Sequence, residues 1–246
     1  MRYKAIIFDL DGTAIPNRKD GMPSQHLIDL IQDLKNKVFV CAATARPFSI
    51  CKEVLKSLQL ISPCVVSGGT RIIDPVTNKT LWEKNIPDEI VGKIIDTTKL
   101  FEYKLFVSNG VDPFLIEKRT KDSERIIYIM SVSKPDVDLL LQELSNISEI
   151  SAFPVPAYTS GLFDIHVTHK DATKKQALEL LLEMLKVNKE DVIGFGDGNN
   201  DLPIFAAVGY KVAMGNSTQE LKDIADLVAP TAEEDGVAIV LEKLMV

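Results

Sequence analysis

A short apolar run near the amino terminus ends in two carboxylates and a glycine turn. The run Ala5-Ile6-Ile7-Phe8 predicts a buried strand, and Asp9-Leu10-Asp11-Gly12-Thr13 follows it directly. Carboxylates are costly to remove from water unless something compensates their charge, and a cation is the usual compensation. The chain must therefore fold so that this strand end meets a counter-charge.

A second acidic glycine turn closes another apolar run far downstream. There, Val192-Ile193-Gly194-Phe195 leads into Gly196-Asp197-Gly198-Asn199-Asn200-Asp201. Two strand ends that both deliver carboxylates predict one divalent-metal site assembled from distant parts of the chain. Oxygen ligands favour a hard cation, and few protein ligands favour magnesium with retained waters.

The segments around these turns alternate between apolar strands and amphipathic helices. Strands are expected at 4–8, 38–43, 64–66, 191–195, 210–214 and 226–228. Helices are expected at about 24–36, 47–58, 173–186, 201–207 and 217–224, with Ser24 as the first N-cap. This alternation predicts an α/β fold, a Rossmann-like parallel sheet with helices on both faces.

The rhythm changes between residues 81 and 166. Helices are expected there at 87–101 and 135–146, and strands at 104–107, 125–132 and 163–167. Strands grouped in this way, with fewer crossover helices, predict a smaller α+β domain inserted into the α/β domain. We expect a core of residues 1–80 and 167–246 and an inserted domain of residues 81–166.

Composition limits the partners of the chain. Its 246 residues carry 35 acidic and 28 basic side chains, and the net charge of −7 argues against nucleic acid or an anionic membrane as the main partner. Cys41, Cys51 and Cys64 lie among apolar segments and are expected to be reduced core thiols. No signal peptide or membrane-spanning run is evident, so we expect a cytoplasmic protein.

Four strand ends carry the residues of chemical interest. Ligands of open α/β sheets bind outside the carboxyl ends of the strands. The four groups are Asp9 with Asp11, Thr44 with Arg46, Ser67-Gly68-Gly69, and Asp197 to Asp201. Magnesium held by carboxylates, beside a hydroxyl and basic side chains, is suited to a phosphoryl group.

The two acidic turns resemble the first and last motifs of the haloacid dehalogenase (HAD) superfamily. The inserted domain resembles, by position and rough pattern, the cap of the Cof-like or type IIB branch. The resemblance implies a HAD core with a cap that selects the substrate. It also implies a magnesium-dependent phosphatase that hydrolyses a small phosphomonoester, such as a sugar phosphate, through an aspartyl-phosphate.

The resemblance also implies roles for individual residues. Asp9 would be the nucleophile, and Asp11 would protonate the leaving alcohol and then activate water. Thr44 would bind the phosphoryl oxygens, and Lys174 would neutralise them. The metal would be held by Asp9, the backbone carbonyl of Asp11, and Asp197. The supporting residues would be Gly12, Arg46, Gly68, Asn200 and Asp201.

Three motifs depart from the family pattern. The family often has Thr-Gly-Arg where this chain has Thr44-Ala45-Arg46, and alanine does not adopt positive φ easily. Lys175 replaces the usual glycine after the lysine, so either Lys174 or Lys175 could be the active residue. Ser67-Gly68-Gly69 replaces the common Asn-Gly-Ala.

Other functions remain open at this point. The same chemistry would serve a phosphomutase acting on sugar phosphates, and the same fold a regulator that binds a phosphorylated ligand without turnover. The chain could be a monomer or a homodimer.

Several further groups are candidate ligand contacts. The loops at 108–110 and 158–160 are candidate specificity positions, and Arg119, Lys121 and Arg125 could meet an anionic substrate. His166 and His169 superficially resemble a metal pair, but their spacing on a strand does not direct both rings at one ion.

Overall fold

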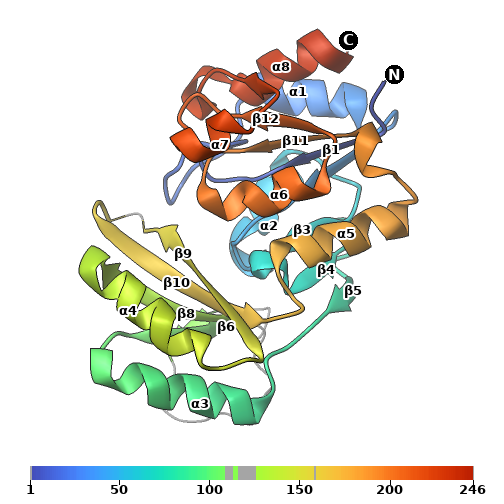
Figure 1. Cartoon of the computed structure of the whole chain (residues 1–246). Helices are drawn as coiled ribbons and strands as arrows, with labels where there is room; N and C mark the ends of the chain where they lie inside the picture. Colours follow the sequence, from blue (N-terminus) through green and yellow to red (C-terminus); the bar gives the residue numbers. More distant parts are fainter. Residues whose placement is uncertain (1, 109–112, 116–125, 158, 246) are drawn as a thin grey trace.

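The computed structural model describes residues 2–108, 113–115, 126–157 and 159–245 (Figure 1). It holds a core around a parallel sheet and a smaller module around an antiparallel sheet. Within the described ranges, no helix has the length and apolar character needed to cross a membrane.

Five parallel strands form the core sheet in the order β13-β12-β11-β1-β2. Their bounds are Ala5–Phe8 (β1), Phe39–Ala42 (β2), Val192–Gly196 (β11), Tyr210–Ala213 (β12) and Leu227–Val228 (β13). The register aligns Phe8 with Phe195 on one side and with Ala42 on the other. The loops that follow these three strands therefore leave the same edge of the sheet.

Helices cover both faces of this sheet. Their bounds are Gln25–Leu34 (α1), Phe48–Ser57 (α2), Lys174–Leu185 (α5), Leu202–Ala207 (α6), Gln219–Asp223 (α7) and Gly236–Met245 (α8). Alternate residues of β1 point to opposite faces, so Ile6 packs in the cluster of α1, α2 and α8, and Ile7 in that of α5, α6 and α7. The predicted Rossmann-like α/β fold is confirmed, and the Ser24 hydroxyl accepts from the Leu27 amide at 3.0 Å as the predicted N-cap.

The strand predicted at 64–66 is not a member of the parallel sheet, to which an isolated bridge between Ala43 and Val65 joins it. It is β3 (Cys64–Val66), which pairs antiparallel with β4 (Arg71–Ile73), and β4 pairs with β5 (Thr80–Glu83). The chain reverses at a short 3₁₀ helix (Ser67–Gly69) whose three residues all have positive φ, of 53°, 66° and 108°. Strands β4 and β5 were not predicted, because their three and four residues are too short for a clear periodicity.

The inserted module is an antiparallel sheet covered by two helices. The strand order is β7-β6-β8-β10-β9, with bounds Leu105–Ser108 (β6), Pro113–Leu115 (β7), Ile126–Ser133 (β8), Ile150–Pro156 (β9) and Leu162–His169 (β10). The helices are α3 (Asp88–Thr98) and α4 (Lys134–Ser145). The predicted α+β insertion is confirmed, whereas its limits at 81 and 166 stay a prediction, since β10 runs unbroken from 162 to 169.

Strand β9 was absent from the predicted strands. It contains Pro154 and Pro156, which cannot donate a backbone hydrogen bond, and proline within a run argues against a central strand. In the structure β9 lies at the edge of its sheet, where proline is tolerated.

Short 3₁₀ helices complete the described elements. Besides the one after β3, they are Lys99–Phe101, Lys189–Asp191, Asn199–Asp201 and Ala232–Glu234.

Candidate active site

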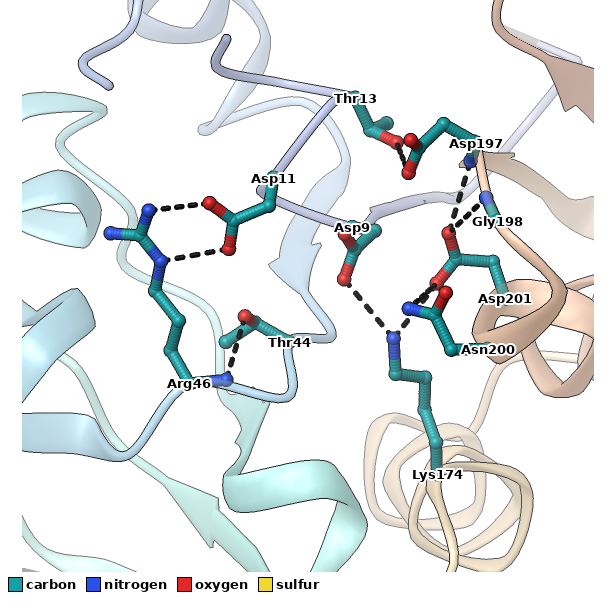
Figure 2. A network of polar contacts seen from close by, with 10 residues as sticks. All are labelled: Asp9, Asp11, Thr13, Thr44, Arg46, Lys174, Asp197, Gly198, Asn200 and Asp201. Carbon is teal, nitrogen blue, oxygen red and sulfur yellow. Dashed lines mark hydrogen bonds and ion pairs between the residues drawn. The ribbon is translucent and has the colours of Figure 1, made fainter. Parts of the chain in front are cut away.

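A buried lysine joins the two acidic motifs. The Nζ atom of Lys174 donates to Oδ1 of Asp9 at 3.1 Å and to Oδ1 of Asp201 at 2.8 Å (Figure 2). Burial alone would lower the pKa of Lys174, but the carboxylates of Asp201 and Asp9 raise it, so the lysine stays charged. Strand β1 and helix α5, 165 residues apart in the chain, thus meet at one ion pair.

The position of Lys174 is fixed by the start of helix α5. Thr173 and Gln176 form a reciprocal capping box there. Gly69 packs against the same helix end, since a Cβ on it would lie 2.3 Å from the Lys174 amide nitrogen. The glycine replacing alanine in Ser67-Gly68-Gly69 therefore allows the close approach of this loop to the lysine.

Asp201 organises the second acidic turn. Its Oδ2 accepts from the backbone amides of Asp197 and Gly198 at 3.0 and 3.2 Å, while its Oδ1 meets Lys174 (Figure 2). Asn200 lies beside it, with Nδ2 3.5 Å from Oδ1 of Asp201. With both its oxygens engaged in this way, Asp201 orients Asp197 and Lys174.

The carboxylates of Asp9, Asp197 and Asp201 form a cluster that fits a divalent cation. One oxygen of each lies within 4.8 Å of the others. Burial is the main cause that raises the pKa of both Asp9 and Asp197, and the negative charge of Asp201 is the second. One lysine does not balance three such acids, and a cation bound by oxygen ligands would supply the missing charge. Gly12 leaves room for this cluster, because a Cβ on it would lie 2.3 Å from Oδ2 of Asp197.

Asp11 is held by Arg46 outside this carboxylate cluster. The Nε atom of Arg46 donates to Oδ2 of Asp11 at 2.7 Å, and its Nη2 contacts the other oxygen (Figure 2). The Thr44 hydroxyl accepts from the Arg46 amide at 3.1 Å. Ala45 has no positive φ, so arginine reaches the site without the glycine that the family often carries. The contacts with Arg46 involve the side chain of Asp11. A metal contact through the backbone carbonyl of Asp11 stays a prediction.

The structure separates the two candidate lysines. Lys174 is buried in the site, whereas the side chain of Lys175 is 54% exposed and lies 3.8 Å from Glu179. Gly68 faces the inserted module, where an added Cβ would lie 3.3 Å from the side chains of Ile126 and Phe153.

Two contacts of Asp197 were not predicted. The Asn216 side-chain amide donates to the carbonyl of Gly12 at 2.8 Å and lies 3.4 Å from Oδ2 of Asp197. The Thr13 hydroxyl lies 3.4 Å from the other oxygen (Figure 2). Asn216 follows the end of β12, so the rule that ligand-binding loops follow parallel strands could have identified it.

A cavity of about 380 Å³ opens between the core and the inserted module. On the core side it is lined by Asp9, Asp11, Thr44, Arg46, Asp197 and Asn200, among others. Strands β6, β8, β9 and β10 provide the opposite wall, which we call the roof. The site residues thus face a cavity large enough for a small metabolite.

The other predicted ligand contacts have different outcomes. Asn109, Gly110, Tyr158, Arg119, Lys121 and Arg125 lie outside the described residues. Thr159 and Ser160 are exposed. Of the histidine pair, His166 lines the cavity, while Nδ1 of His169 accepts from the Asp171 amide at 3.1 Å.

Comparison with known proteins identifies the family. The family model of the haloacid dehalogenase-like hydrolases matches residues 6–155 and 115–241 of the chain. The chain is 26% identical over 264 residues to 5-amino-6-(5-phospho-D-ribitylamino)uracil phosphatase YitU of Bacillus subtilis, covering 97% of this chain and 96% of that one. It is 28% identical over 242 residues to phosphoglycolate phosphatase of Methanopyrus kandleri, covering 98% and 96%.

The fold agrees with this assignment. A sugar phosphatase of HAD subclass IIB superposes with a TM-score of 0.81 at 18% identity, covering 98% of both chains. The chain belongs to the haloacid dehalogenase-like hydrolase family, and the two relatives named above are phosphatases.

Proposed function

We propose that this protein is a magnesium-dependent phosphatase that hydrolyses a small phosphomonoester through an aspartyl-phosphate on Asp9. The observation that carries the proposal is the buried contact of Lys174 with Asp9 at the floor of the cavity. A nucleophilic carboxylate must stay ionised, and the lysine favours that form against the burial that opposes it.

The proposed reaction has two steps. In the first, an oxygen of Asp9 bonds to phosphorus as the bond from phosphorus to the leaving alcohol breaks, and Asp11 gives that alcohol a proton. In the second, Asp11 takes a proton from a water molecule that attacks phosphorus, which releases phosphate and restores the carboxylate of Asp9. Thr44 and Lys174 would stabilise the charge on the phosphoryl oxygens.

The cation site is proposed at Asp9, Asp197 and the backbone carbonyl of Asp11. Magnesium bound there would neutralise negative charge on the carboxylates and on the phosphoryl group. Asp201 and Asn200 would keep Asp197 oriented toward it through the contacts described above.

Phosphate release from a panel of small phosphomonoesters, with magnesium and with EDTA, tests the activity. We expect release that requires the cation and favours some esters over others. A phosphosugar isomerised without free phosphate would identify a phosphomutase instead. Tight ligand binding without hydrolysis of any ester would identify a binding protein.

The substitution Asp9→Asn tests the intermediate. The amide keeps the shape of the side chain but is a poor nucleophile, so turnover should be abolished. Lys174 would still pair with Asp201, and circular dichroism should show an intact fold. Wild-type turnover in this variant would exclude the aspartyl-phosphate at Asp9.

A further inference from the structure

The roof of the cavity is built by the alternation of side chains along two strands. In β8 and β10, Ile127 and Ile165 pack in the apolar cluster with α3 and α4. Their neighbours Tyr128, Asp164 and His166 line the cavity. Because successive residues of a strand point to opposite faces, the same short segments build the core of the module and the wall of the site.

Two polar atoms of this roof are buried without a partner. The Tyr128 hydroxyl and Nδ1 of His166 have no hydrogen-bond partner among the residues that the structure describes. Their side chains are only 6% and 7% exposed. Such an atom costs about 1–3 kcal/mol, and most buried polar atoms in proteins are satisfied. Both side chains line the cavity, so a molecule bound against them would supply the missing partners.

The two side chains are held in place by ring contacts. The rings of Tyr128 and His166 meet edge to face, with centroids 4.8 Å apart and planes at 85°. Phe153 contacts the imidazole from another direction, at 5.6 Å. A pair fixed in this way loses little conformational entropy when it binds a ligand.

The histidine acts here as a neutral group. Burial, with the nearby charge of Lys174, lowers the pKa of His166 to about 3. A neutral imidazole offers one donor and one acceptor nitrogen, and a tyrosine hydroxyl can both donate and accept. The pair therefore suits a hydroxyl or amide group rather than an anion.

The charges around the cavity also favour an uncharged group over an anion at the roof. Among the lining residues that the structure describes, Arg46 is the one positively charged side chain, and it is engaged with Asp11. Asp164 adds an acid on the roof, where its carboxylate accepts from the Ser131 amide at 2.8 Å. The remaining roof residues are apolar: Phe106, Met130, Val155 and Pro156. A second negative charge on the substrate would meet acids and apolar groups there.

We propose that Tyr128 and His166 determine specificity by hydrogen-bonding an uncharged leaving group, which carries a hydroxyl or amide and lies against the apolar roof. The inference rests on the proposed phosphatase function, since it concerns the alcohol released from the same phosphomonoester.

The test compares kcat/KM for four kinds of ester: sugar phosphates, glycerol phosphate, phenyl phosphate and phosphoglycolate. In the wild type, the best uncharged hydroxylated ester should exceed phosphoglycolate. Tyr128→Phe should lower kcat/KM for that ester about 5- to 30-fold and leave phenyl phosphate, which lacks a second polar group, within about twofold. His166→Phe should act in the same direction.

Thermal unfolding separates this role from a structural one. Tyr128→Phe removes a hydroxyl without a partner, so the melting temperature of the ligand-free protein should stay the same or rise. Tyr103→Phe is the matched control, because the Tyr103 hydroxyl donates to Asp136 at 2.5 Å and lies outside the cavity lining. That control should lower the melting temperature and leave the ratio between esters unchanged.

Three results would overturn the inference while leaving the phosphatase in place. The first is an equal loss of kcat/KM on all esters in Tyr128→Phe. The second is a lower melting temperature of Tyr128→Phe with an unchanged ratio of kcat/KM between esters. The third is a wild-type preference for phosphoglycolate. Wild-type protein that releases phosphate from no ester would instead overturn the proposed function, and this inference with it.

Discussion

At the scale of single residues, Lys174 has the strongest influence on the site. It is the positive charge shared by Asp9 and Asp201, and all three side chains are buried. Removing one partner from a buried ion pair is far more costly than removing an exposed charge, because the remaining charge stays out of water.

The pair Lys174→Met and Lys175→Met tests this difference. Lys174→Met should lower the free energy of unfolding by about 3–5 kcal/mol in EDTA, because two buried carboxylates lose their counter-charge. Lys175→Met should change it by less than about 0.5 kcal/mol, since its contact with Glu179 is exposed. Urea unfolding measures both, and equal effects would contradict the assignment of Lys174 as the buried partner.

At the scale of the elements, the turn Ser67–Gly69 places β3 and helix α5 in contact. Gly69 has a φ of 108°, and its α-carbon faces the backbone of Thr173 and Lys174. The helix that carries the lysine can therefore approach the sheet edge only because this position has no side chain.

Gly69→Ala should destabilise the protein by more than about 1 kcal/mol, because alanine is strained at positive φ and its Cβ would overlap the start of α5. Gly92→Ala is the matched control. Gly92 lies inside α3 with no atom within 4 Å of a built Cβ, so alanine there should stabilise by about 0.5–1 kcal/mol. Chemical denaturation measures both changes, and a neutral Gly69→Ala would show that the two backbones can separate at little cost.

At the scale of the whole molecule, the carboxylate cluster links stability to pH and to metal. The pKa values of Asp9 and Asp197 are raised in the folded protein by burial and by the charge of Asp201. The folded state then binds more protons than the unfolded state once the pH exceeds the ordinary carboxyl range near about 4. The contribution of these groups is complete at low pH and is lost as the pH rises through the raised values.

In EDTA, the free energy of unfolding of the wild type should therefore fall from about pH 5 to about pH 8 relative to that of Asp197→Asn. Magnesium should restore stability in the wild type, and more strongly at the higher pH, where the carboxylates are ionised. Urea unfolding at the two pH values, with and without magnesium, provides the comparison. Parallel pH dependences of the two proteins would contradict the raised pKa of Asp197.

The inserted module forms one wall of the cavity. One face of its sheet lines the cavity opposite the core carboxylates, and α3 and α4 cover the other face. Figure 1 shows the module beside the loop edge of the core, reached from β5 and leaving toward α5. This arrangement places residues 128 and 166 opposite residues 9 and 197, far from them in the chain.

The sequence alone determined the α/β core, the inserted α+β module and both acidic motifs. These follow from local patterns: apolar runs of period two, amphipathic helices, and glycine turns after strands. Tertiary structure decided which side chains meet. Distances between segments far apart in the chain decide the contact of Lys174 with Asp9, the pairing of Asp11 with Arg46, and the contact of Asn216 with Gly12. The sequence also did not predict that Tyr128 and His166 line the cavity. A buried polar residue on a strand gives no local sign of which surface it will face.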